Sequence, residues 1–149
     1  MENTNKRRFS RFTIPWVARL DFGLIEYKGS VEDVSCSGLY VEGCFDQSHG
    51  DVCVIDLKDS TTGRYSIITA ICSICRISDD GIALKFVSMK FDNLFFLQTR
   101  LLSKAAYPSI VMKEFSMKKH FFKFDGDFVF FESFKWNQSD IKQLLSLPR

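Results

Sequence analysis

The sequence lacks three features that would each place it in a well-known class of protein. No apolar stretch continues without charge for the roughly 18 to 20 residues that a membrane span requires. The net charge is only +2, so no general electric field would draw the chain to nucleic acid or to an anionic membrane. The five cysteines are odd in number, and no apolar segment follows the basic start, which argues against a secreted disulfide framework. We therefore expect a soluble cytoplasmic protein, in which any anion site is local.

Signs of catalysis and of metal binding are also scarce. His49 and His120 are far apart in the sequence, and neither adjoins a nucleophile motif such as GxSxG. Cys72 and Cys75 have the spacing of metal ligands, but no second pair completes the set, and positions three apart in a strand point to opposite faces. We interpret both as buried structural thiols. The sequence thus predicts neither an enzyme nor a metal centre.

What the chain does contain is enough apolar and aromatic material for one compact domain. Its 149 residues are 46% hydrophobic and include 16 phenylalanines, which excludes a disordered or low-complexity protein. Short alternating segments separated by turns, with no helical period between them, favour an antiparallel barrel or sandwich. The predicted strands lie at residues 16–27, 52–57, 66–77 and 81–87 and in two pieces on either side of Gly38, with a first turn at 28–30.

The period changes near residue 91. Apolar residues between 94 and 102 share one face of a helix, which we expect to begin at a cap on Asp92. It should run to about Ala105 or Ala106, because Tyr107 and Pro108 follow. This helix is expected to lie on the sheet or to close the barrel.

The region beyond Pro108 is rich in phenylalanine and lysine. Asp125-Gly126 predicts a two-residue hairpin, and residues 140–147 predict a short helix capped by Ser139. The alternating phenylalanines fit a strand core or a partner interface, or else a basic aromatic platform for single-stranded RNA. The lysines of that platform would be Lys113, Lys118, Lys119, Lys123 and Lys135.

Two short motifs stand apart from this framework, and the first lies in a basic leader at residues 1–12. It reads Arg7-Arg8-Phe9-Ser10-Arg11. Each guanidinium of Arg7 and Arg11 offers a forked pair of donors that can bind a phosphate or a guanine edge. By itself such a cluster is also typical of a solvated terminus.

The second motif is the segment DVSCSG at residues 33–38. Asp33 and Ser35 are two residues apart, so they share one face of an extended chain. The carboxylate can accept from ring N–H and amino groups, the hydroxyl can donate or accept, and Gly38 removes a side chain where a ligand would approach the backbone. The alternative is an Asx or Ser turn ended by the glycine.

Together the two motifs resemble the signature of the PilZ family, a group of bacterial domains known as receptors for cyclic di-GMP. The family pattern is RxxxR in a leader, then a strand, then [D/N]xSxxG. The matching residues, in the same order and spacing, are Arg7, Arg11, Asp33, Ser35 and Gly38. The segment GIALKF at 81–86 is similar to the family's late strand of the form GxGxxF, with Ala83 in place of the second small residue.

The resemblance covers residues 6 to about 107 and implies a mainly β fold, a six-stranded antiparallel barrel with a helix after its last strand. It divides the chain into a leader at 1–12, a barrel with its helix at 13–107, and a C-terminal extension at 108–149. The leader would fold across the outside of the barrel to trap the nucleotide.

The resemblance also implies roles for individual residues. Arg7 and Arg11 would take phosphate and guanine acceptors, while Asp33 and Ser35 hold the guanine edge. The expected ligand-binding set is Arg7, Arg8, Arg11, Asp33, Ser35 and Gly38. Lys6 would add positive charge, and Arg76 is either a further stacking surface or a solvated strand residue.

The function implied is that of a stand-alone cyclic di-GMP receptor in a bacterial cytoplasm, with no metal or other cofactor. Ligand binding would order the leader and signal to a protein partner, with motility or biofilm formation as the output. One alternative is a PilZ-like adaptor that binds proteins but no nucleotide. The other is an RNA-binding module that uses the aromatic C-terminal region.

Overall fold

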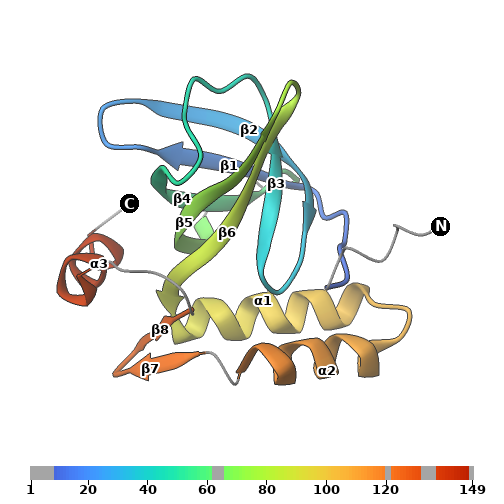
Figure 1. The fold of residues 1–149 in the computed structure, drawn as a ribbon. Helices are drawn as coiled ribbons and strands as arrows, with labels where there is room; N and C mark the ends of the chain where they lie inside the picture. Colours follow the sequence, from blue (N-terminus) through green and yellow to red (C-terminus); the bar gives the residue numbers. More distant parts are fainter. Residues whose placement is uncertain (1–8, 62–65, 120–121, 132–136, 148–149) are drawn as a thin grey trace.

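The structure, a computed structural model, describes residues 9–61, 66–119, 122–131 and 137–147. Six antiparallel strands form the body of the molecule (Figure 1). In chain order they are β1 (Trp16–Asp21), β2 (Glu26–Val34), β3 (Gly38–Glu42), β4 (Val52–Asp59), β5 (Ser66–Ser78) and β6 (Gly81–Lys90). Their order in the sheet is β3-β2-β1-β4-β5-β6, and a pairing of β3 with β6 closes the barrel. The six-stranded antiparallel barrel predicted above is confirmed.

The strands form because their apolar residues alternate with polar ones. In β1, Trp16, Ala18 and Leu20 point inward and are buried, while the residues between them face outward. Ile55 and Leu57 of the neighbouring strand β4 fill the same interior. The barrel core is therefore built by the alternation that the sequence displays.

The first turn of the barrel lies at residues 22–25, and the prediction of a turn at 28–30 is wrong. Gly23 has a φ of +99°, and its N–H donates to Asp21 Oδ1 at 2.8 Å, so these residues make the reversal. Gly29 instead lies inside β2, opposite Ala18. A Cβ on Gly29 would come within 2.3 Å of the Glu42 carbonyl oxygen. The glycine at that position allows a close approach of β3 rather than a turn.

Helix α1 (Phe91–Lys104) lies across one end of the barrel (Figure 1). Leu94, Leu97 and Leu101 on its inner face are buried in the barrel core, which confirms a helix that closes the barrel. The capping position is Lys90 rather than the predicted Asp92. Asp92 lies in the first turn, where a negative charge still favours the helix dipole.

A second helix, α2 (Pro108–Lys119), runs antiparallel beside α1 and was not predicted (Figure 1). Pro108 does not stop a helix here. It is the first residue of α2, where the backbone N–H that proline lacks would make no hydrogen bond within the helix. Val111 and Phe115 of α2 are buried and join the main core.

The chain then returns to the barrel through the predicted hairpin, β7 (Lys123–Asp125) and β8 (Phe128–Phe130). Gly126 has a φ of +61° in its turn, and β8 pairs with the end of β6. Helix α3 (Gln138–Leu145) follows and packs on the outside of the barrel. Its cap is Asn137, whose side chain accepts from the N–H groups of Ser139 and Asp140; the predicted cap, Ser139, is therefore one of the donors.

The cysteines divide into two groups. Cys36, Cys53 and Cys72 are buried, whereas Cys44 and Cys75 are exposed. The interpretation of Cys75 as a buried thiol is therefore wrong, because positions three apart in β5 do face opposite sides and only Cys72 faces inward. Among the described helices, none is both long and apolar enough to cross a membrane.

Candidate functional site

The end of the leader is held against β2 by backbone hydrogen bonds. The N–H of Phe12 donates to the Val34 carbonyl, and the N–H of Val34 donates to the Phe12 carbonyl, both at 2.9 Å. This bridge places Arg11 beside Asp33, with 3.8 Å between Arg11 Nη1 and Asp33 Oδ2. The two side chains remain partly exposed, at 33% and 18% respectively. Opposite charges from the two motifs therefore meet at one point of the surface.

The connection from β2 to β3 is a tight turn organised by Ser35. Its N–H donates to the Gly38 carbonyl at 2.8 Å, and its Oγ accepts from the Ser37 N–H at 3.2 Å. The same Oγ also lies 3.1 Å from Ser37 Oγ. The serine turn weighed as an alternative is thus present. A hydroxyl has one donor and two acceptor sites, so Ser35 can hold this turn and still take part in a ligand contact.

Gly38 stands where β3 and β6 approach most closely. A Cβ at this position would lie 2.0 Å from the Leu84 carbonyl oxygen and 3.0 Å from Lys85 Cα, both backbone atoms of β6. A side chain here is incompatible with the strand pairing that closes the barrel. Gly38 thus permits a close approach of the β6 backbone, and the approach of a ligand at this position stays a prediction.

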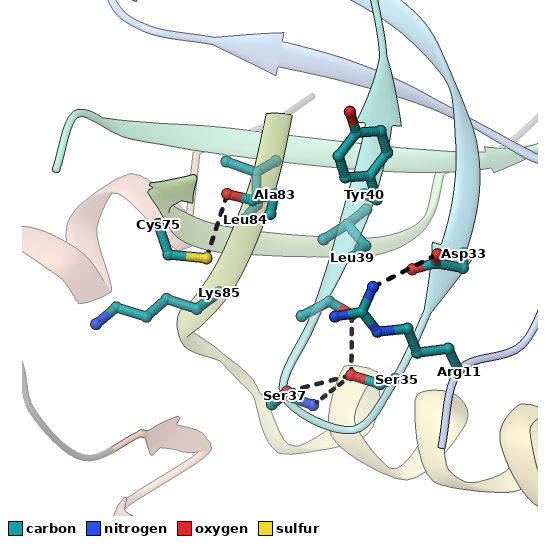
Figure 2. Close-up of a pocket in the computed structure, with 11 residues that line it drawn as sticks. Arg11, Asp33, Ser35, Ser37, Leu39, Tyr40, Cys75, Ala83, Leu84 and Lys85 are labelled. Atoms are coloured by element: carbon teal, nitrogen blue, oxygen red, sulfur yellow. Dashed lines mark hydrogen bonds and ion pairs between the residues drawn. The ribbon is translucent and has the colours of Figure 1, made fainter. Parts of the chain in front are cut away.

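These residues surround one pocket of about 100 Å³. Figure 2 shows the Arg11 side chain reaching in from one side, between Asp33 and the serine turn, with Lys85 on the opposite side. The pocket is lined by Arg11, Asp33, Ser35, Ser37, Gly38, Leu39, Tyr40, Cys75, Ala83, Leu84 and Lys85. Pockets that enclose drug-sized ligands usually measure about 300 to 1,000 Å³, so this one can enclose only part of a nucleotide.

Tyr40, which lines the pocket, makes a further polar contact with a residue of the β5–β6 turn. Tyr40 donates its hydroxyl to Asp80 Oδ1 at 2.6 Å, and this hydrogen bond raises the pKa of the tyrosine above its usual value. The Arg76 guanidinium lies 5.6 Å from the centre of the Tyr40 ring, on the side of the pocket formed by β5. Arg76 therefore touches a residue of the pocket, and its Nη1 also donates to Ser78 Oγ at 3.2 Å.

The structure brings together four of the six predicted site residues. Arg11, Asp33, Ser35 and Gly38 line the same pocket, although a strand separates the two motifs in sequence. Arg7 and Arg8 lie outside the described residues, as does Lys6. Whether any of these residues binds a ligand stays a prediction.

Seven residues of the pocket are not in the predicted site, and three of them, Lys85, Tyr40 and Cys75, bear on its chemistry. Lys85 pairs with Gly38 across the β3–β6 ladder, Tyr40 follows that glycine by two positions, and Cys75 lies on β5. Lys85 belongs to the GIALKF segment, so the register of that strand would have been needed to find it. A second positive charge, opposite Arg11, makes the pocket more suitable for an anion.

The C-terminal region considered as a basic aromatic platform contributes some of its phenylalanines to the core. Phe130 and Phe131 are buried, which confirms a core role for these two phenylalanines. The Lys118 ammonium lies 5.8 Å from the Phe9 ring centre and 6.0 Å from that of Phe131. Lys135 lies outside the described residues. Among the residues that the structure places, no group of His, Cys, Asp or Glu is arranged to hold a metal ion.

Comparison with known proteins gives one matching family and several solved structures of similar fold. The model of the PilZ domain matches residues 5–99. No curated protein matches the chain. The PilZ domain of YcgR from Escherichia coli, solved with c-di-GMP, is similar in structure with a TM-score of 0.55 at 13% identity, covering 78% of this chain and 98% of that one.

Two longer proteins share the fold. MrkH from K. pneumonia, in complex with c-di-GMP, gives a TM-score of 0.53 at 18% identity over 76% of this chain. The Bacillus subtilis inhibitor of motility, MotI/DgrA, gives 0.52 at 14% identity over 70% of this chain. The present chain covers 56% and 55% of their respective lengths, so it spans about half of each.

Proposed function

The chain belongs to the PilZ domain family, and on that premise we propose that it is a receptor for cyclic di-GMP. The observation that carries the proposal is the meeting of Arg11, Asp33 and Ser35 at one pocket beside Gly38. The fold places these residues together from the leader, from β2 and from the β2–β3 turn. Two structural neighbours of this fold, YcgR and MrkH, were solved with the same nucleotide.

The chemistry of the pocket matches the two parts of this ligand. A guanine base presents ring N–H and amino donors on one edge, which the Asp33 carboxylate can accept, and acceptor atoms on another, which an arginine fork can bind. The Arg11 and Lys85 side chains provide positive charge on two sides for the phosphates. Ser35 offers a further hydrogen bond near Asp33.

The small size of the pocket indicates how the rest of the ligand would be held. A volume of about 100 Å³ accommodates a fragment rather than a cyclic dinucleotide, so additional contacts must come from outside the pocket. In our proposal the leader closes over the ligand, with Arg7 and Arg8 providing these contacts. The residues after 107 would then carry the response to a protein partner, and the protein would act as a receptor rather than an enzyme.

The test is a calorimetric titration of the full chain with cyclic di-GMP, with GTP and cyclic di-AMP as controls. We expect selective binding of cyclic di-GMP, and loss of that binding in the double variant Arg7→Ala/Arg11→Ala. A folded protein that binds none of the three nucleotides would contradict the proposal.

The second candidate function is that of an adaptor which binds a protein but no nucleotide. It is favoured by a group of exposed apolar side chains on and beside the two helices, where Phe91, Phe95, Met112 and Phe124 are each about half exposed or more. Single exposed apolar residues are ordinary, but several on one face are typical of interaction surfaces. Absence of nucleotide binding in the titration would favour this function.

Cys75 offers an independent check on where the ligand lies. Its exposed thiol lines the pocket, whereas Cys44 is exposed but does not. We expect saturating cyclic di-GMP to slow alkylation of Cys75 by iodoacetamide severalfold and to leave Cys44 unchanged, as measured by peptide mass spectrometry. Cys36 and Cys53 should not react in the folded protein, because burial raises the pKa of each to about 12 and the thiolate is the nucleophile. Protection of Cys44 as well, or none at Cys75, would place the ligand elsewhere.

A further inference from the structure

The leader touches helix α2 one residue before Arg11. Both the N–H and the hydroxyl of Ser10 donate to Glu114 Oε2, at 3.0 Å and 2.7 Å. Glu114 lies 104 residues further along the chain, in the middle of α2. This helix lies beyond residues 5–99, the part that the family model matches. The contact is therefore made by a segment outside the matched PilZ domain.

Neighbouring contacts hold the leader on either side of Ser10. The Phe9 ring packs against the main core, and the Lys118 ammonium of α2 lies 5.8 Å from its centre. On the other side, Phe12 is bonded to β2 through its own N–H and carbonyl. Arg11 therefore lies between two residues with fixed backbones: Ser10 is hydrogen-bonded to α2, and Phe12 is hydrogen-bonded to the barrel. The backbone of Arg11 has little freedom left, so its side chain starts from a fixed point beside the pocket.

Glu114 also lies near the turn that forms the pocket. Cys36, the residue after Ser35, is buried, and this burial raises the pKa of its thiol to about 12, with the negative charge of Glu114 adding to the rise. Cys36 also belongs to the same buried core cluster as Phe115, the residue after Glu114 in α2. One side chain of α2 is therefore near both the leader and the serine turn.

We propose that Glu114 is a positioning residue for the nucleotide site, which fixes Ser10 and so holds Arg11 over the pocket before the ligand arrives. The inference rests on the proposed function, since it concerns the same pocket. A binding residue that is already ordered loses less conformational freedom on binding, and this raises affinity without any new contact. By reciprocity, a bound ligand that favours the docked leader also strengthens the contact with α2. Helix α2 would then respond to the ligand without touching it.

The experiment compares the full-length wild type with Glu114→Ala, Glu114→Gln and Asp46→Ala, and adds Ser10→Ala alone and combined with Glu114→Ala. Asp46 is an exposed carboxylate in the β3–β4 connection. Its replacement by alanine changes the net charge by the same amount as Glu114→Ala does, without affecting the leader. Hydrogen exchange of the Ser10 amide is measured without nucleotide, and cyclic di-GMP affinity is measured by calorimetry. We expect Glu114→Ala to speed the exchange of that amide and to weaken cyclic di-GMP binding about tenfold.

The other variants separate positioning from general stability. Glu114→Gln keeps an acceptor oxygen and should recover most of the affinity, whereas Asp46→Ala should match the wild type in both measurements. Ser10→Ala keeps the backbone donor, and its effect on affinity should largely vanish when Glu114 is already alanine. A purely structural role would lower the melting temperature of Glu114→Ala while leaving the affinity intact.

Each failure has a distinct meaning. Wild-type affinity in Glu114→Ala, or unchanged exchange of the Ser10 amide, would overturn the role of Glu114 and leave the receptor function standing. Failure of the wild type itself to bind cyclic di-GMP would overturn both. In that case the exchange measurement would still report whether Glu114 fixes the leader.

Discussion

Replacing Arg11 with alanine is expected to weaken cyclic di-GMP binding by about 30-fold or more, with little change in folding. A hydrogen bond to a charged group contributes about 2 kcal/mol, which corresponds to about 30-fold in Kd. The contact that Arg11 makes without ligand is a partly exposed ion pair with Asp33 at 3.8 Å. Such pairs contribute at most about 1 kcal/mol, so the melting temperature should change by no more than about 4 °C. Calorimetric titration and thermal unfolding of the same preparation measure the two effects.

The Asp33→Ala variant is the comparison for this result. It removes the same ion pair, so its effect on folding should be similar, but it should weaken guanine nucleotides more than other anions. If Arg11→Ala lost fold and binding together, the residue would have a structural role. If Arg11→Ala and Asp33→Ala reduced binding of every anion equally, the pocket would be a general anion site rather than a guanine site.

Replacing Gly38 with alanine is expected to have the largest effect on the fold. The added Cβ would meet the Leu84 carbonyl oxygen at 2.0 Å, and a strand backbone cannot move away as a flexible side chain could. We expect a loss of about 3 kcal/mol or more in the free energy of unfolding, equivalent to a fall of roughly 6 to 12 °C in melting temperature. Nucleotide binding should be lost with it, because β3 and the serine turn move together. Thermal unfolding by circular dichroism measures the first effect, and titration measures the second.

Gly23→Ala is the matched control for that prediction. Gly23 has a positive φ, but a Cβ there would meet nothing within 4 Å. The substitution therefore adds backbone strain alone, about 1 kcal/mol, at a turn that does not line the pocket. Equal stability losses at Gly38 and Gly23, or a fully stable Gly38→Ala protein, would show that β3 and β6 can separate without penalty.

The barrel could be predicted from the sequence because each strand carries its own alternation of inward and outward residues. The misplaced first turn shows the limit of this reasoning. Lys28-Gly29-Ser30 has the composition of a turn, and only the position of β3 reveals that Gly29 is needed for a close approach within a strand. Glycine occurs both in turns and at close approaches between strands, so the sequence alone could not distinguish the two roles.

Helix α2 escaped prediction for a related reason. Its apolar residues are spread around the helix instead of forming one stripe, and Pro108 can either stop a helix or begin one.

The partner of Ser10 could not be predicted either, because Glu114 follows it by 104 residues. The two motifs of the candidate site were visible because each is local in sequence. The residues that complete or support the pocket, Lys85 and Glu114, come from elsewhere and depend on the tertiary fold.

The pairing of β8 with β6 also constrains how the two helices can move. The chain leaves β6 at Lys90 and returns to pair Phe128 with that same residue, and the N–H of Phe91 donates to the Asp127 carbonyl at 2.7 Å. Topologically, β6 and β8 form a hairpin whose loop is the pair of helices together with β7. Both ends of this loop are bound to β6, so α2 cannot detach from the barrel at one end alone. Any movement of α2 must therefore be a tilt or a slide of the helical pair about that fixed base.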